Sequence, residues 1–125
     1  MHTPNFNILY VANPTESAAF YGDILGCKPV ESSPGFAMFV LDDGFKLGLW
    51  LKNAVRPPVS AEAGGSEMIL ACDSNDEVDR VHNAWKLKGI AILQAPETME
   101  FGYTFTAADP DGHRLRVYCV SESPM

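Results

Sequence analysis

The feature that most constrains the fold of this chain is one order of elements that occurs twice. A β-rich run over residues 6–12 leads into Asn13-Pro14-x-Glu16, where Asn13 can cap a helix and Pro14 suits its first position. Gly26 ends the helical pattern. Three short β-like runs follow, at residues 27–32, 36–41 and 45–51. The first half therefore predicts the order βαβββ.

The second half repeats this order. A strand-like run over residues 67–72 precedes Ser74 and Glu77, which form a capping-box pattern, and Gly89 marks the end of the helix. Further β-like runs lie at residues 90–95, 103–108 and 114–120. The second copy is longer, and we place its additional residues in a longer helix and in a loop near residues 97–102. The repetition of element order indicates a duplicated unit.

The duplication predicts a single α+β domain over residues 1–125. Module 1 spans about residues 5–51, a linker rich in Pro, Ala and Gly spans residues 52–65, and module 2 spans about residues 66–120. Neither βαβββ unit can bury both faces of its sheet alone. We therefore expect the modules to pack side by side around a curved half-barrel cleft, with the helices on the convex side.

Composition excludes several classes of partner. Nine Lys and Arg residues oppose sixteen Asp and Glu residues, and the resulting net charge of −7 argues against nucleic acid as a partner. No apolar run approaches the length of a membrane span, and the N-terminus lacks a signal-peptide pattern. Cys27, Cys72 and Cys119 lie far apart and predict buried free thiols in a reducing compartment. We expect a cytoplasmic protein without a membrane partner.

Three motifs carry a family resemblance. Asn-Pro-x-Glu-Ser-x-x-Phe-Tyr at residues 13–21, the Leu-Gly that follows at 25–26, and Asp-Pro-Asp-Gly-His at residues 109–113 resemble the vicinal oxygen chelate superfamily. That superfamily includes glyoxalases, extradiol dioxygenases, fosfomycin-resistance enzymes and bleomycin-resistance proteins. Trp50, the helix pattern at residues 77–85 and Phe-Gly-x-Thr-Phe at residues 101–105 are similar to small antibiotic-binding proteins of the phenazine-resistance type. The resemblance implies paired βαβββ modules in a homodimer whose ligand cavities involve both chains.

Metal-using members of this superfamily place His, Glu or Gln on the first and fourth strands of each unit. The matching positions here are Phe6, Gly48, Glu67 and Arg116. Of these, only Glu67 has an atom that binds metals, and a guanidinium group repels cations, so we expect no metal and no cofactor. Two interpretations of Glu67 stay open. It is either the base of a metal-free lyase or isomerase, or the partner of Arg116 in an ion pair across the seam.

Strand alternation predicts which side chains share the cleft with these four positions. Ile8, Trp50, Ile69, Arg114 and Tyr118 have the same parity. The family pattern adds Thr104 and Thr106, and leaves Tyr103 and Phe105 on the helix side. The third strand directs either Phe36 with Met38 or Ala37 with Phe39 toward the cleft. The predicted ligand-binding residues are Phe6, Phe36, Gly48, Trp50, Glu67, Phe101, Thr104, Arg116 and Tyr118.

An aromatic wall of this kind suits a planar aromatic ligand, because flat rings stack. We expect Trp50 to contribute most, Gly48 to leave space for the ligand, Phe101 to close the cleft as a lid, and Arg116 to hold a carboxylate of the ligand. The sequence thus predicts metal-independent sequestration of a hydrophobic aromatic small molecule, such as an antibiotic. The alternatives are an enzyme of the same fold, namely a glyoxalase-like lyase, a dioxygenase or a thiol transferase, and a sensor module.

Overall fold

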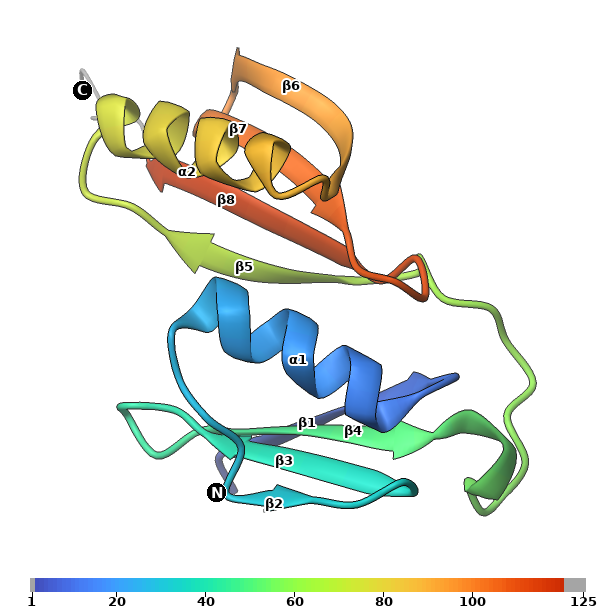
Figure 1. Ribbon diagram of the computed structural model, residues 1–125. Coiled ribbons are helices and arrows are strands. Elements are labelled where there is room, and N and C mark those ends of the chain that lie inside the picture. Colours follow the sequence, from blue (N-terminus) through green and yellow to red (C-terminus); the bar gives the residue numbers. More distant parts are fainter. Residues whose placement is uncertain (1, 121–125) are drawn as a thin grey trace. The chain divides into compact units, whose positions relative to one another are not determined.

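Each half of the chain forms a four-stranded mixed sheet with one helix packed on it (Figure 1). The computed structural model describes residues 2–120, and the division between the two units falls between Ala63 and Gly64. Both units have the order βαβββ, which confirms the α+β class predicted from the duplicated pattern. Within residues 2–120, neither helix combines the length and the apolar character that crossing a bilayer requires.

Unit 1 contains four strands, one helix and one short 3-10 turn. In chain order these are β1 (Phe6–Val11), α1 (Pro14–Leu25), β2 (Glu31–Ser32), β3 (Phe36–Val40), β4 (Lys46–Leu51) and η1 (Lys52–Ala54). The strand order across the sheet is β1-β4-β3-β2. β1 and β4 are parallel neighbours, although they lie far apart in the sequence, and the other pairs are antiparallel.

Local signals at both ends of α1 work as predicted. The Asn13 side chain accepts a hydrogen bond from the Glu16 N–H at 3.1 Å, and Pro14 occupies the first helical position. Gly26 has a φ of +68°, the left-handed conformation that ends many helices.

The strand after α1 is shorter than the predicted run at residues 27–32. Only Glu31–Ser32 form a strand, and they pair with β3. The Cys27 N–H donates to the Gly22 carbonyl at 3.2 Å and so closes the end of α1 instead of pairing with β3. Pro29 has no N–H to donate. Pairing with β3 therefore begins only at Val30, whose N–H donates to the Met38 carbonyl at 2.8 Å.

Unit 2 repeats the architecture with longer elements. It contains β5 (Glu67–Ala71), α2 (Asn75–Leu87), β6 (Ala91–Met99), β7 (Gly102–Ala108) and β8 (Arg114–Val120). The strand order is β5-β8-β7-β6, with β5 and β8 parallel. The order and the parallel pair match those of unit 1, as expected for a duplicated unit.

The start of α2 is capped by two reciprocal hydrogen bonds. Ser74 Oγ accepts from the Glu77 N–H at 3.1 Å, and Glu77 Oε1 accepts from the Asp73 N–H at 2.8 Å. The capping box is confirmed, with its return bond one residue ahead of the cap. Trp85 is buried against the Phe105 ring, with 5.4 Å between ring centroids. This contact fixes α2 to β7.

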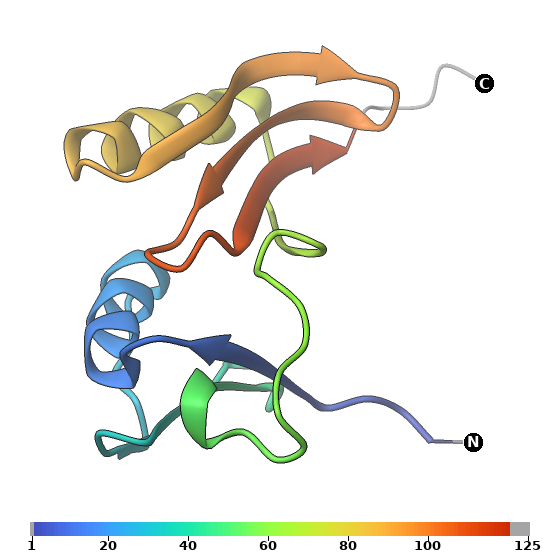
Figure 2. The ribbon, with the colours of Figure 1, turned by 90° about the vertical axis from the view of Figure 1, so that its right-hand side faces the viewer.

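The β6–β7 hairpin corrects the prediction for residues 97–102. These residues were expected to form a loop, but β6 continues to Met99 and β7 begins at Gly102, giving the long curved hairpin seen in Figure 2. The predicted β-like run ends at residue 95, directly before Pro96. Pro96 is tolerated because β6 is the edge strand and because the β6–β7 register shifts between Gln94 and Glu97, around the proline.

The two faces of each sheet differ in character. One face packs on the helix and holds the core, which includes Ala37, Phe39, Leu47 and Leu49 in unit 1 and Phe105, Ala107, Leu115 and Val117 in unit 2. We call the opposite face the open face. The burial of Ala37 and Phe39 settles the alternative for the third strand, and places Phe36 and Met38 on the open face, with Met38 paired to Gly48.

Gly22→Ala is expected to destabilise the protein, although alanine normally favours a helix over glycine. A Cβ atom at residue 22 would lie 2.9 Å from the Cys27 carbonyl oxygen, which belongs to the backbone and cannot rotate away. We expect the free energy of unfolding to fall by about 1–3 kcal/mol, the range typical of overpacking. Urea denaturation measures this. An unchanged or raised midpoint would show that the helix end adjusts without cost.

Candidate functional site

Arg116 is the centre of a polar network on the open face of unit 2. Its Nε donates to Glu67 Oε1 at 2.7 Å, and its Nη1 donates to Gln94 Oε1 at 3.1 Å and to Thr104 Oγ1 at 3.2 Å. The Arg116 side chain is 14% exposed and the Glu67 side chain 30%. Of the two interpretations left open for Glu67, the structure shows the ion pair with Arg116. This ion pair joins β5 and β8, adjacent strands of one sheet.

Gln94 is part of this network and was not predicted from the sequence. Thr106 Oγ1 donates to Gln94 Oε1 at 2.9 Å, and Gln94 Nε2 donates to Glu97 Oε1 at 2.6 Å. Simple alternation along β6 fails because the register shifts on both sides of Gln94. A polar residue two positions before a proline in an edge strand is the sequence signal that could have indicated this bulge.

A pocket of about 370 Å³ lies beside the network. Its lining consists of Glu67, Ile69, Phe101, Arg116 and Tyr118. The Phe101 ring centroid is 5.5 Å from the Arg116 guanidinium carbon and 6.0 Å from the Tyr118 centroid, with the rings edge to face. We call these five residues the Arg116 pocket. Four of them are predicted ligand-binding residues.

The remaining predictions for unit 2 can be placed around this pocket. Thr104 and Thr106 are buried on the Arg116 side of the sheet, while Phe105 packs on α2, as the parity predicted. Phe101 was expected in a long loop, as a lid. It instead occupies the tight turn between β6 and β7, and its ring lies against the guanidinium of Arg116.

The open face of unit 1 corrects the expectation for Gly48. A Cβ atom at this position would lie 2.9 Å from Phe6 Cε1, 3.1 Å from Phe36 Cζ and 3.2 Å from Ile8 Cγ1. The missing side chain therefore leaves no free space for a ligand, because three neighbouring side chains fill it. Trp50 stands nearby and half-buried, in edge contact with Tyr10 at 6.3 Å between ring centroids.

The family resemblance assigned four positions to metal ligands in metal-using members. These positions lie on β1 (Phe6), β4 (Gly48), β5 (Glu67) and β8 (Arg116). Phe6 and Gly48 offer no donor atom, and Arg116 is a cation. Glu67 Oε1 already accepts a hydrogen bond from Arg116. This set of residues does not fit a divalent cation, which needs about three protein ligands. Across residues 2–120, no three His, Cys, Asp or Glu side chains cluster as metal ligands.

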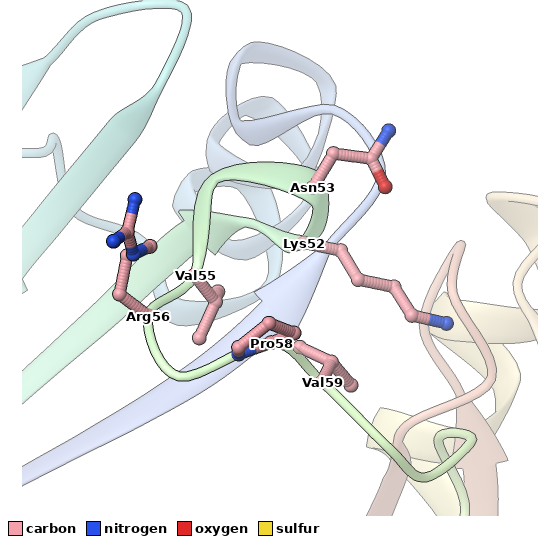
Figure 3. Close-up of a pocket in the computed structure, with 6 residues that line it drawn as sticks. All are labelled: Lys52, Asn53, Val55, Arg56, Pro58 and Val59. Atoms are coloured by element: carbon pink, nitrogen blue, oxygen red, sulfur yellow. The ribbon is translucent and has the colours of Figure 1, made fainter.

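A second pocket, of about 410 Å³, lies at the end of unit 1. Its lining consists of Lys52, Asn53, Val55, Arg56, Pro58 and Val59. Two cations suggest an anion site, but Figure 3 shows the Lys52 and Arg56 side chains pointing to opposite sides. Lys52 Nζ also lies 3.7 Å from Glu62 Oε2. The two charges do not converge on one ligand.

Comparison with known proteins places this architecture in a family. The model of the Glyoxalase/Bleomycin resistance protein/Dioxygenase superfamily matches residues 3–117. The chain is 32% identical over 118 residues to the phenazine antibiotic resistance protein EhpR of Enterobacter agglomerans, an alignment that covers 92% of this chain and 90% of that protein.

Two solved structures are similar to this one. Protein ATC0852 from Agrobacterium tumefaciens is 52% identical with a TM-score of 0.90, and the match covers 98% of this chain and all of that chain. A glyoxalase-related enzyme from Fulvimarina pelagi shares the fold at 23% identity, with a TM-score of 0.82 and coverage of 95% and 88%. The chain therefore belongs to the glyoxalase/bleomycin resistance/dioxygenase superfamily, as its motifs predicted.

Proposed function

We propose that this protein binds a planar aromatic small molecule in the Arg116 pocket and sequesters it unchanged, as an antibiotic-resistance protein that needs no metal. The observation that carries this proposal is the pocket itself. Two aromatic rings, those of Phe101 and Tyr118, and the apolar Ile69 surround a guanidinium whose charge Glu67 balances.

The rings supply the affinity. Phe101 is 41% exposed and Ile69 is 54% exposed, which leaves apolar surface for a ligand to cover. Stacking of one aromatic ring on another contributes about 0.5–1.5 kcal/mol beyond the burial of area. The pocket volume of about 370 Å³ lies at the lower end of the range typical of small-molecule sites.

Arg116 supplies orientation. Its Nε and Nη1 atoms are hydrogen-bonded, whereas its Nη2 atom makes no hydrogen bond to any of residues 2–120. A ring nitrogen, carbonyl or carboxylate of the ligand would accept from Nη2. Because Glu67 neutralises the guanidinium, we expect a neutral acceptor to bind at least as well as a carboxylate.

The similarity to a phenazine antibiotic resistance protein supports an antibiotic as the ligand. Sequestration protects by mass action, so it requires tight binding and abundant protein, but no chemical step. The donor set at Phe6, Gly48, Glu67 and Arg116 supports independence from metal.

We extend the proposal to a homodimer. The open-face side chains of β1 are unusually exposed for large apolar groups, at 38% for Phe6, 38% for Ile8 and 41% for Tyr10. A second copy of the chain would cover such a strip, as the family resemblance implies. Light scattering should give twice the mass of 13.6 kDa. A monomeric mass at micromolar concentration would contradict this part of the proposal.

The test of function uses chelator-treated full-length protein and calorimetric titration with phenazine and with phenazine-1-carboxylate, followed by mass spectrometry of the recovered ligand. We expect saturable binding of about one ligand per chain and an unchanged ligand mass. A changed mass, or binding that appears only when Mn²⁺, Ni²⁺ or Zn²⁺ is added, would instead identify an enzyme of the same fold.

Trp50, which does not line the Arg116 pocket, tests where the ligand binds. The sequence predicts that Trp50→Ala weakens binding of the aromatic ligand by more than about tenfold while the protein stays folded, because Trp50 presents a large ring on the open face of unit 1. The same titration measures the change, and circular dichroism checks the fold. Unchanged affinity would remove Trp50 from the site and leave the Arg116 pocket as the place of binding.

A further inference from the structure

Two thiols outside the Arg116 pocket are neighbours on adjacent strands. Cys72 directly follows β5, and Cys119 lies near the end of β8. The last residue pair of the parallel β5–β8 ladder is Ala71 with Tyr118. The Cys72 N–H donates to the Tyr118 carbonyl at 2.7 Å, which extends the ladder by one residue. Cys119 is therefore the residue beside Cys72.

Both thiols lie on the helix face of the sheet. Leu115 and Val117 of β8 are buried on that face, and Cys119 continues their alternation. Cys72 continues the alternation of Met68 and Leu70 on β5 in the same way. Adjacent strands are about 4.8 Å apart, which lies within the Cα separations of about 4.4–6.8 Å that a disulfide allows.

Small molecules can reach both thiols. Cys72 and Cys119 are half-buried free cysteines that line one cavity of about 750 Å³, together with Asp73 to Asp76 at the start of α2 and Val120. Figure 1 shows β5 and β8 ending on the side of unit 2 where α2 begins. The cavity lies on the opposite face of the sheet from Arg116, so it is a separate site.

We infer that Cys72 and Cys119 form a redox-active pair that a peroxide converts into a cross-strand disulfide. The thiolate of one cysteine attacks a peroxide oxygen, which forms a sulfenic acid and releases water or an alcohol. The sulfur of the other cysteine then attacks the sulfenic sulfur, the S–S bond forms and water leaves. Two electrons and two protons pass from the thiols to the peroxide. A small dithiol then reduces the protein disulfide to two thiols by exchange and is itself oxidised to a cyclic disulfide.

The charges around Cys72 set the pH dependence of this reaction. Burial raises the pKa of the Cys72 thiol above its ordinary value, and the carboxylates of Glu77 and Asp73 and the neighbouring Cys119 raise it further, while Arg80 acts in the opposite direction. The thiolate is the reactive form. The rate at which Cys72 itself attacks the peroxide should therefore keep rising with pH beyond 9.0, the ordinary pKa of a cysteine thiol.

The experiment treats the full-length protein with hydrogen peroxide, blocks the remaining thiols with iodoacetamide and digests with trypsin without reduction. Because trypsin does not cleave before proline, the three cysteines fall in separate peptides, at residues 1–46, 53–80 and 117–125. We expect a disulfide to join peptide 53–80 to peptide 117–125. Reduction with dithiothreitol should release the two peptides separately. Alkylation of both Cys72 and Cys119 after peroxide treatment would overturn the inference.

Cysteine variants supply matched controls. Cys27→Ser should still lose both remaining thiols to peroxide, whereas Cys72→Ser and Cys119→Ser should form no intramolecular disulfide. A cross-link that involves Cys27, or one that joins two chains, would also contradict the inference. The wild-type peptide map decides the question even if a variant folds poorly.

Discussion

Phe101→Ala is expected to weaken binding of the aromatic ligand about thirtyfold. In the proposed site the ring would cover the ligand on one side, and its centroid lies 5.5 Å from the guanidinium carbon of Arg116 and 6.0 Å from the Tyr118 centroid. Removing it loses stacking and buried apolar area together, about 2 kcal/mol of binding free energy. Because Phe101 is 41% exposed in the free protein, the stability should change by less than about 1 kcal/mol. Calorimetric titration of the variant with phenazine measures the loss.

Leu93→Ala is the matched control for this variant. Leu93 lies in the same hairpin and is 50% exposed, against 41% for Phe101, but it does not line the Arg116 pocket. We expect its affinity to stay within about twofold of the wild type. Equal losses in the two variants would mean that the hairpin as a whole, and not the Phe101 ring, supports binding.

The elements that the sequence predicted well are those specified by local interactions. Asn13 and Ser74 cap their helices through their own side chains, and Gly26 ends α1 through its own backbone conformation. Such signals need no knowledge of the neighbouring strands. The faces of β7 were implied instead by the family resemblance, which correctly placed Thr104 on the side of Arg116 and Phe105 on the side of α2.

The predictions that failed depend on contacts between distant residues. Pro96 stays within a strand because of the position of β6 at the sheet edge, and that position is set by β7. Gly48 looked like free space, but Phe6 and Phe36 come from other strands and fill it. Gln94 reaches Arg116 only through a bulge. Pairing and side-chain packing across strands decide all three, and neither follows from a local pattern.

Arg116→Met is expected to lower the free energy of unfolding by about 2–3 kcal/mol, the largest stability effect of any variant proposed for the Arg116 pocket. The change removes the donor to Glu67, Gln94 and Thr104, while the methionine keeps much of the aliphatic stem. Urea denaturation measures the loss. Arg114→Met is the control, because Arg114 is exposed on the same face of the same strand. The free energy of unfolding of this variant should differ from that of the wild type by less than about 0.5 kcal/mol.

A double-mutant cycle separates the ion pair from the rest of the network. Glu67→Gln keeps an oxygen that Arg116 can donate to but removes the charge, so we expect it to cost about 1 kcal/mol. The double variant with Arg116→Met should lose less free energy of unfolding than the sum of the two single-variant losses. We expect the difference, which is the coupling energy, to be about 1 kcal/mol. Additive losses would show that Arg116 stabilises the sheet through Gln94 and Thr104 alone. Glu67 would then be free to interact with a ligand, and the open interpretation of Glu67 as a base would regain support.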